Sequence, residues 1–215
     1  MTSSALQWIS NAYLGGYLRA AFIDCQKAEY LHLDDKTPFT TARDFAKSLR
    51  ERRVPISHFL YDQSKPKSLQ PFLYKGAQHH RFPNRNMDFE GVIPDSNNEW
   101  VYPKETYNGF TNPFSKEVVG HVDRTPSPDQ KSLLLCAGFT ARCCVQETAI
   151  GSFKKAANPD NHQVVIALNA TNLHPNYYDL YQSDLLAAAP EEIRHQIGFA
   201  TTGEIISAIH QAFTP

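Results

Sequence analysis

The stretch 133–149, LLLCAGFTARCCVQETA, decides the expected fold. It opens as an apolar run, turns at Gly138, and leads into apolar residues at helical spacing, namely Val145, Ala149 and Phe153. A continuous apolar run is typical of a buried parallel strand, and apolar residues four positions apart mark one face of a helix. This stretch therefore predicts a strand, a glycine-containing turn and a helix, the repeating unit of an α/β protein.

Strand-like and helix-like segments alternate on both sides of this unit. The expected strands are Leu18–Ile23, Val54–Tyr61, Trp100–Tyr102, Leu133–Ala137, Val164–Leu168 and Ile197–Ala200, and the expected helices are Thr41–Arg53, Arg142–Ala157, Tyr177–Ala189 and Gly203–Phe213. Such alternation predicts one doubly wound, Rossmann-like α/β domain over residues 1–215. We expect a six-stranded parallel sheet in the order 3-2-1-4-5-6, with helices on both faces.

Two segments stand apart from this alternation. Residues 1–16 are expected to form an N-terminal extension. Residues 62–99 contain four prolines and several aromatic residues but no clear periodicity. A loop of this length in a compact domain is usually functional, so we expect it to cover substrate or to contact another subunit.

Composition narrows the class of protein. The 215 residues are 41% hydrophobic, enough for a core, and their formal net charge of −1 offers no basic patch for nucleic acid. Residues 1–16 lack the pattern of a secretory signal, and no apolar run approaches about 18 residues, so we expect a soluble, cytoplasmic protein with no membrane partner. The four cysteines form neither a disulfide framework nor a zinc motif.

Two residues stand where a parallel sheet places its chemistry. Asp24 directly follows the first strand, and Cys144 lies in the first turn of the helix after the fourth. These strands are neighbours at the switch point, where doubly wound folds bind ligands. A thiol at a helix N-terminus has a lowered pKa and lies beside free backbone N–H groups. Simpler roles stay open for these residues. Asp24 could cap a turn, and Cys144 could be a small buried hydrophobe. A lone lysine such as Lys104, which follows the third expected strand, is ordinarily on the surface.

Three motifs together resemble those of the isochorismatase-like cysteine hydrolases, the family that includes nicotinamidases and N-carbamoylsarcosine amidase. They are Ile23-Asp24-x-Gln26, Lys104-x-x-Tyr107-x-x-Phe110 and Gly138-x-x-x-x-x-Cys144-Val145-x-x-Thr148-Ala149, in the order in which the family carries them. The resemblance spans about residues 17–213. It implies that Cys144 attacks a carbonyl carbon, that Asp24 takes the thiol proton, and that Lys104 stabilises the thiolate.

The resemblance also implies how the rest of the site is built. A cis peptide bond is expected at Phe139–Thr140, and the oxyanion hole is expected at the backbone N–H groups of Thr140 and Cys144. Family members are commonly oligomers, so a homo-oligomer that acts on a small molecule is expected. The side chains expected near the motifs as a substrate pocket are Gln26, Trp100, Tyr107, Phe110 and Phe139.

Two positions depart from the family pattern. Nicotinamidases carry an Asp-x-His metal motif after the second strand, but here Asp62 is followed by Ser64 in place of the histidine. One acid and the displaced pair His79-His80 do not make a metal site, so we expect no metal and no cofactor, and nicotinamide is disfavoured as a substrate. Asn169 stands where the family usually has an acid after the fifth strand, which affects a supporting hydrogen bond and not the three catalytic residues.

The sequence thus predicts a metal-independent hydrolase of a small amide, ureido or related C–N substrate, acting through a covalent acyl-enzyme on Cys144. Three alternatives stay open. They are a related hydrolase without amide specificity, a family-like domain that acts as a non-catalytic interaction module, and a redox sensor built on Cys143 and Cys144. Turnover of esters or vinyl ethers would identify the first alternative. An unreactive Cys144 would favour the second, and mass shifts after peroxide treatment would reveal the third.

Overall fold

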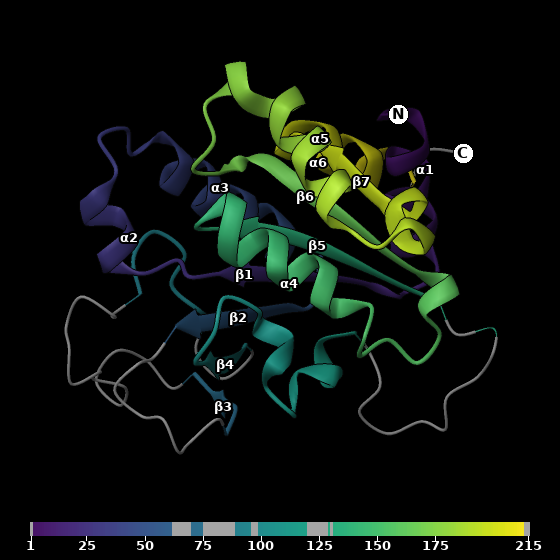
Figure 1. Cartoon of the computed structure of the whole chain (residues 1–215), viewed down its shortest axis with the longest axis horizontal. Coiled ribbons are helices and arrows are strands. Elements are labelled where there is room, and N and C mark those ends of the chain that lie inside the picture. The colour runs from purple at the N-terminus through teal and green to yellow at the C-terminus, as the bar shows by residue number, and fades with distance from the viewer. Residues whose placement is uncertain are drawn as a thin grey trace.

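A seven-stranded sheet forms the centre of the computed structural model, which describes residues 2–61, 70–74, 89–95, 99–119, 129 and 131–212 (Figure 1). Its strands are β1 (Leu18–Ile23), β2 (Ile56–Tyr61), β3 (Phe72–Leu73), β4 (Trp100–Lys104), β5 (Ser132–Gly138), β6 (His162–Thr171) and β7 (Ile197–Ala200), in the spatial order β3-β4-β2-β1-β5-β6-β7. The six parallel strands follow the predicted order. The prediction of six strands in all was wrong, because β3 adds an antiparallel pair at the β4 edge. A two-residue strand is too short to leave a sequence pattern.

Helices cover both faces of the sheet (Figure 1). They are α1 (Thr2–Leu14), α2 (Lys27–His32), α3 (Thr37–Glu51), α4 (Gln146–Ser152), α5 (Tyr178–Ala188) and α6 (Thr202–Gln211). One apolar cluster joins α1, α3 and α6 to one face through Ile9, Phe45 and Ile205. A second cluster joins α4 and α5 to the other face through Ala149 and Leu185. Two separate cores are what a parallel sheet needs, since both of its faces are apolar.

The N-terminal residues form α1 and pack on the domain, so the expected extension is a structural helix. The Ser10 hydroxyl donates to the Ala208 carbonyl of α6 at 2.9 Å. A Cβ at position 198 of β7 would lie 2.8 Å from the Ala5 Cβ, so Gly198 allows α1 to lie close to the sheet edge. The helix was missed because the prediction did not use the apolar spacing of residues 5, 9 and 12.

Helix boundaries differ most from the prediction next to the expected nucleophile. Instead of one helix over 142–157, the chain forms a π-helical turn, Ala141–Val145, and then α4, which ends at Ser152. Helix α3 begins at Thr37, four residues before the predicted start, because Pro38 fits the first helical turn. The short α2 was not predicted.

A buried ionic network ties α3 to the sheet. Arg50 Nε and His58 Nε2 lie 2.7 Å and 2.6 Å from the two carboxylate oxygens of Glu99. Burial alone would raise the pKa of Glu99, but hydrogen bonds from Arg50 and His58 outweigh it and lower that pKa to about 2. Burial lowers the pKa of His58 against the opposing influence of Glu99. Because Arg50 already neutralises Glu99, we assign His58 as neutral with its Nε2–H donating to Glu99.

This network predicts a loss of stability in acid. The His58 pKa is depressed in the folded state, so unfolded chains bind more protons below the ordinary value of 6.5 and stability falls as the pH drops through it. Glu99 adds a second loss as the pH falls from its ordinary pKa of 4.5 towards 2. His58→Gln keeps a donor for Glu99 but cannot titrate. Urea unfolding at about pH 7 and about pH 5.5 should show wild type losing up to about 1.4 kcal/mol more than this variant, and equal losses would contradict the assignment.

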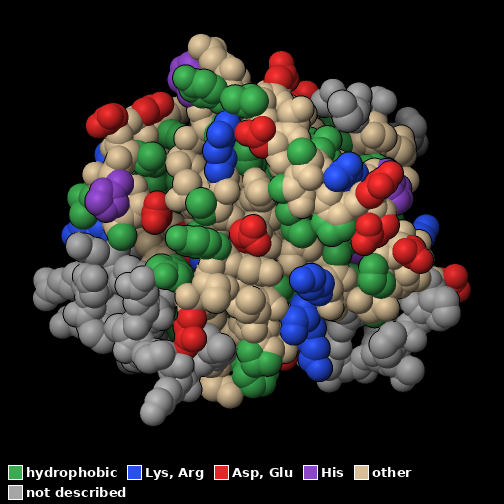
Figure 2. Space-filling view, in the orientation of Figure 1, with side chains coloured by type: hydrophobic (Ala, Val, Ile, Leu, Met, Phe, Trp, Pro, Cys, Tyr) green, Lys and Arg blue, Asp and Glu red, His purple; other side chains and the backbone are tan. Residues whose placement is uncertain are grey.

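The surface adds two observations. None of the described helices is both long and apolar enough to cross a membrane. On the face shown in Figure 2, lysine and arginine side chains of the described residues lie at separate places among acidic ones.

Candidate active site

The carboxyl ends of β1, β4 and β5 bring together the three residues that the sequence singled out. Asp24 directly follows β1, Lys104 is the last residue of β4, and Cys144 lies in the π-helical turn after β5. Lys104 Nζ lies 2.7 Å from Asp24 Oδ2. The charges of Asp24 and Lys104 both act on the Cys144 thiol, which lies beside this pair. The three side chains therefore lie close together at the switch point of the sheet.

Asp24 is fixed in orientation by backbone bonds to β2. Its φ is 49°, a left-handed conformation that aspartate tolerates better than most residues. Its own N–H donates to the Phe59 carbonyl at 2.9 Å, and the Tyr61 N–H donates to its Oδ1 at 2.9 Å. One carboxylate oxygen is thus held by the backbone while the other faces Lys104.

Lys104 has a relative accessibility of 0%, which is unusual for a lysine. Besides its ion pair with Asp24, its Nζ donates to the Thr106 carbonyl at 3.1 Å and lies 5.1 Å from the centre of the Tyr61 ring. A buried ammonium is costly unless its charge and N–H groups are satisfied. These contacts satisfy it, and they also fix a positive charge beside Asp24.

Cys144 rests as a thiol. Burial raises its pKa to about 12, and the charge of Asp24 adds to the rise, while Lys104 and a hydrogen bond with the Thr140 backbone oppose it. This corrects the expectation of a lowered pKa, because the side chain is only 8% exposed and lies beside a carboxylate. Burial also raises the pKa of Asp24, against Lys104, Cys144 and the Tyr61 N–H. An acid with a raised pKa next to a neutral thiol is suited to take its proton.

The turn before Cys144 contains a cis peptide bond between Phe139 and Thr140, where the resemblance placed one. Three bonds hold the turn in place. The Ala141 N–H donates to Asn172 Oδ1 at 2.8 Å, the Tyr181 hydroxyl donates to the Ala141 carbonyl at 3.0 Å, and the Val145 N–H donates to the Thr140 carbonyl at 3.1 Å. The Thr140 backbone, which contains one of the two expected oxyanion-hole groups, opposes the rise of the Cys144 pKa.

Two expected pocket aromatics are core residues instead. The Phe139 ring is fully buried and stacks on Phe39 of α3, with 4.0 Å between ring centres. Phe110 is buried against Phe59, with 5.3 Å between ring centres. Both residues belong to motifs that resemble those of the family, but their side chains point into packed cores, where an apolar ring is most stable.

The other three expected pocket residues also have different surroundings. Trp100 begins β4, at the opposite end of the strand from Lys104, and is 44% exposed. Tyr107 is 58% exposed, and its carbonyl accepts a bond from the Thr148 hydroxyl. The buried Gln26 side chain binds the N–H and carbonyl of Tyr61 at 3.1 Å and 3.2 Å, so it joins the chain after β1 to β2.

Glu29 lies beside the candidate site, and the sequence analysis missed it. Its Oε2 accepts a bond from the Thr140 hydroxyl at 3.3 Å. Burial raises its pKa, and the charge of Asp24 adds to this, while Thr140, His32 and Lys104 lower it. Glu29 lies on α2, a six-residue helix with no buried residues, so no apolar pattern marked it.

The remaining cysteines and Asn169 have structural surroundings. Cys25 and Cys136 are buried, and burial raises the pKa of each. Cys143 is partly buried and packs against the core that contains Cys144. Asn169 Oδ1 accepts the Thr202 N–H at 2.8 Å, so this residue supports the start of α6 rather than touching the three clustered residues.

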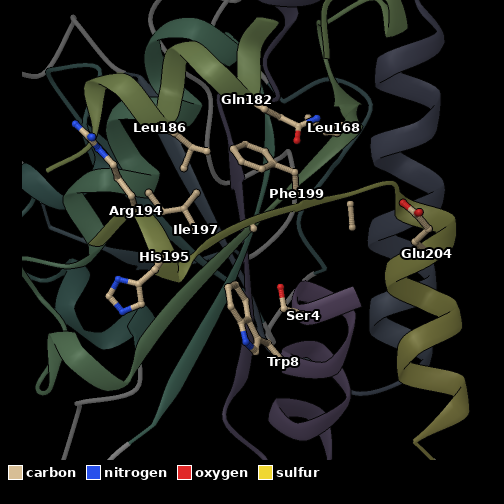
Figure 3. A pocket seen from close by; sticks show the side chains of 12 residues that line it. Ser4, Trp8, Leu168, Gln182, Leu186, Arg194, His195, Ile197, Phe199 and Glu204 are labelled. Atoms are coloured by element: carbon tan, nitrogen blue, oxygen red, sulfur yellow. The ribbon is translucent and has the colours of Figure 1, made fainter. Parts of the chain in front are cut away.

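A groove of about 240 Å³ lies elsewhere, along the sheet edge at β7 (Figure 3). Trp8, Leu186 and Phe199 line its apolar part, with Arg194 and Glu204 at its margins. None of Asp24, Lys104 or Cys144 contributes to it. The chemistry and this groove are therefore separate features of the molecule.

The metal-related positions Asp62, Ser64 and His79-His80 lie outside the described residues, as does most of the expected 62–99 loop. Within the described ranges, no group of three or more His, Cys, Asp or Glu side chains is placed to hold a metal ion.

Comparison with known proteins gives matches in structure only. No family model and no curated protein sequence matches the chain. A cysteine hydrolase from Pseudomonas syringae pv. phaseolicola superposes with a TM-score of 0.63 at 16% identity, covering 92% of this chain and 94% of that one. An isochorismatase family protein from Burkholderia thailandensis gives 0.60 at 15%, covering 90% and 96%. N-carbamoylsarcosine amidase from Thermoplasma acidophilum gives 0.56 at 13%, covering 86% and 96%.

The chain has the isochorismatase-family fold. The superpositions cover about 90% or more of this chain and of each matched chain, so the fold is matched along its length rather than through one βαβ unit. The isochorismatase fold accounts for the sheet order and for the switch point where Asp24, Lys104 and Cys144 meet. At these identities the likeness concerns the fold, and the chemistry must be argued from the site.

Proposed function

We propose that this protein is a cysteine hydrolase that cleaves a small amide, ureido or related C–N substrate through an acyl-enzyme on Cys144. The observation that carries the proposal is the buried Asp24–Lys104 ion pair, at 2.7 Å, beside the Cys144 thiol on which both charges act. Three polar side chains from separate parts of the chain have little structural reason to be buried together. A shared task in proton transfer and attack supplies that reason.

In the first half of the reaction, Asp24 takes the Cys144 proton as the sulfur attacks the carbonyl carbon, forming a C–S bond and an oxyanion. The raised pKa of Asp24 favours this transfer. Lys104 stabilises the thiolate while the proton is on Asp24. The C–N bond then breaks, and the leaving nitrogen receives the proton that Asp24 holds, which leaves a thioester on Cys144.

In the second half, a water molecule replaces the leaving group. Asp24 takes one of its protons as the oxygen attacks the thioester carbon, and the C–S bond breaks. The proton passes from Asp24 to the Cys144 sulfur, which restores the resting thiol. The backbone N–H groups of Thr140 and Cys144 are the donors proposed for the oxyanion in both halves.

Two neighbours in the comparison support this choice of reaction. One is named a cysteine hydrolase and another N-carbamoylsarcosine amidase, whose name denotes cleavage of a C–N bond. Because a fold hosts several chemistries, the support from these names is secondary to the geometry of Cys144, Asp24 and Lys104.

A substrate screen with mass spectrometry tests the proposal. Small primary amides, ureido compounds, esters and vinyl ethers are incubated with the protein, and quenched samples are searched for an acyl adduct on the peptide that contains Cys144. We expect turnover of C–N substrates, an adduct on Cys144 and none in Cys144→Ala, with activity retained after treatment with a chelator. Turnover of esters or vinyl ethers alone would point to a related hydrolase without amide specificity. No turnover together with an unreactive Cys144 would favour an interaction module.

A further inference from the structure

The carboxylate of Glu29 reaches the nucleophile through a single residue. Its Oε2 accepts the Thr140 hydroxyl at 3.3 Å, and the carbonyl of the same Thr140 accepts the N–H groups of Cys143 and Val145, the two neighbours of Cys144. Both Glu29 and Thr140 are partly exposed, whereas Cys144 is 8% exposed. A molecule that approaches the thiol from this side therefore meets the Glu29 carboxylate.

The charges around Cys144 do not balance. Lys104 is paired with Asp24 at 2.7 Å, so this fully buried cation is already neutralised. Among the described residues, no lysine, arginine or histidine lies within 4.0 Å of Glu29. His32 and Lys104 influence it only through space, and Asp24 opposes them. Among the described residues, the site therefore carries an excess of one negative charge when Glu29 is ionised, located on a half-buried group.

A carboxylate in this position would bind a positively charged group of a ligand. A half-buried carboxylate without a cationic partner is stabilised by an ammonium or guanidinium, and the resulting charge-assisted bonds are about twice as strong as neutral ones. Thr140 bonds Oε2, which leaves Oε1 for such a group. A general-base role for Glu29 is less well supported, because Asp24 and not Glu29 acts on the Cys144 thiol.

We propose that Glu29 is a specificity-determining residue that selects substrates with an ammonium or guanidinium group close to the scissile C–N bond. The inference names the substrate class of the site and rests on the proposed function. It requires that the charge of Glu29, and not only its bond to Thr140, act on the molecule that meets Cys144. Glu29→Gln separates the two, since glutamine keeps an oxygen acceptor for Thr140 and loses the charge.

The test uses three thiol reagents of different charge, so it does not depend on turnover. Aminoethyl, methyl and sulfonatoethyl methanethiosulfonate are cationic, neutral and anionic. In each case the Cys144 thiolate attacks the sulfenyl sulfur, a disulfide forms and methanesulfinate leaves. Rates are measured by mass spectrometry in a Cys143→Ala background, for wild type at Glu29, for Glu29→Gln, and for Glu192→Gln, a remote exposed control with the same change in net charge.

We expect Glu29→Gln to lower the rate ratio of cationic to anionic reagent on the order of tenfold, because a unit charge within several ångströms of a partly screened site acts with about that strength. Glu192→Gln should leave the ratio unchanged. Comparing variants cancels differences in reagent size. Equal ratios in wild type and Glu29→Gln would overturn the proposal, and a Cys144 that none of the reagents modifies would overturn the proposed function as well.

Amide substrates separate the two proposals further. If neutral and cationic amides of matched size are hydrolysed, Glu29→Gln should lose activity on the cationic one and keep it on the neutral one. An equal loss on both would make Glu29 a residue that only positions Thr140, which contradicts the specificity proposal while the hydrolase stands. Reagent ratios that follow the charge of Glu29, without hydrolysis of any amide, would contradict the hydrolase while the recognition of cations stands.

Discussion

Cys144→Ala, Asp24→Asn and Lys104→Met should each lower kcat/KM by at least about 10³-fold, and combining them should cost little more than the most damaging single change. Cys144→Ala removes the attacking sulfur. Asp24→Asn leaves a group that cannot take the thiol proton, and burial, the largest cause of the raised Cys144 pKa, persists in this variant. Lys104→Met removes the charge that faces Asp24 at 2.7 Å. Because each single change already prevents the three residues from acting together, the losses in kcat/KM should not add when the changes are combined.

Stability measurements distinguish this loss of chemistry from a loss of folding. Removing one partner of the buried Lys104–Asp24 pair leaves the other charge uncompensated, at a cost of about 3–5 kcal/mol in the free energy of unfolding. Asp24→Asn combined with Lys104→Met removes both charges, so the double variant should regain part of that stability. Its activity should stay at the level of the single variants, because stability and catalysis depend on the pair for different reasons.

Cys143→Ala is the matched control for these variants. Its side chain is one residue from Cys144 but only packs against the core, so its removal should change kcat/KM by less than about threefold. Activity in the Cys144→Ala variant, or losses that multiply when the three changes are combined, would contradict a site in which the three residues act as a unit.

The sequence predicted those parts of the fold that depend on long apolar patterns. The continuous apolar run at Leu133–Ala137 is β5, which is buried along its whole length, and the strands on either side of it lie where the alternation placed them. Position relative to a strand end was also sufficient to bring Asp24 and Cys144 together. Lys104 depended on the family resemblance, because no property of a lone lysine in a sequence marks it as buried.

Side-chain direction and short elements could not be predicted in this way. Phe110 and Phe139 lie within the motifs that resemble those of the family but point into cores, since the direction of a side chain follows from packing that a motif does not encode. The Cys144 pKa was predicted with the wrong sign because burial and the neighbouring carboxylate outweigh the position in a helical turn. Glu29 escaped notice because α2 buries no residues and shows no pattern.

Gly138→Ala should be the most destabilising small substitution at the edge of the site. Gly138 ends β5 with φ of +120°, a conformation that side-chain-bearing residues rarely adopt. A Cβ there would lie 2.0 Å from the Ile23 carbonyl oxygen and 2.6 Å from the Ile23 nitrogen, both backbone atoms. Ile23 cannot move away easily, because its carbonyl accepts the Phe139 N–H at 2.7 Å. We expect a loss of more than about 4 kcal/mol in the free energy of unfolding, measured from urea denaturation.

Gly203→Ala provides the control for that measurement. Gly203 lies in the first turn of α6, where an added Cβ meets no atom within 4 Å, so alanine should stabilise the protein by up to about 1 kcal/mol through its higher helix propensity. The two glycines thus predict opposite signs for the same chemical change. Because Ile23 directly precedes Asp24, any shift that relieves the clash at Gly138 should also displace the carboxylate from Cys144. A Gly138→Ala protein with wild-type stability and activity would therefore contradict the close approach of β1 and β5 on which the site is built.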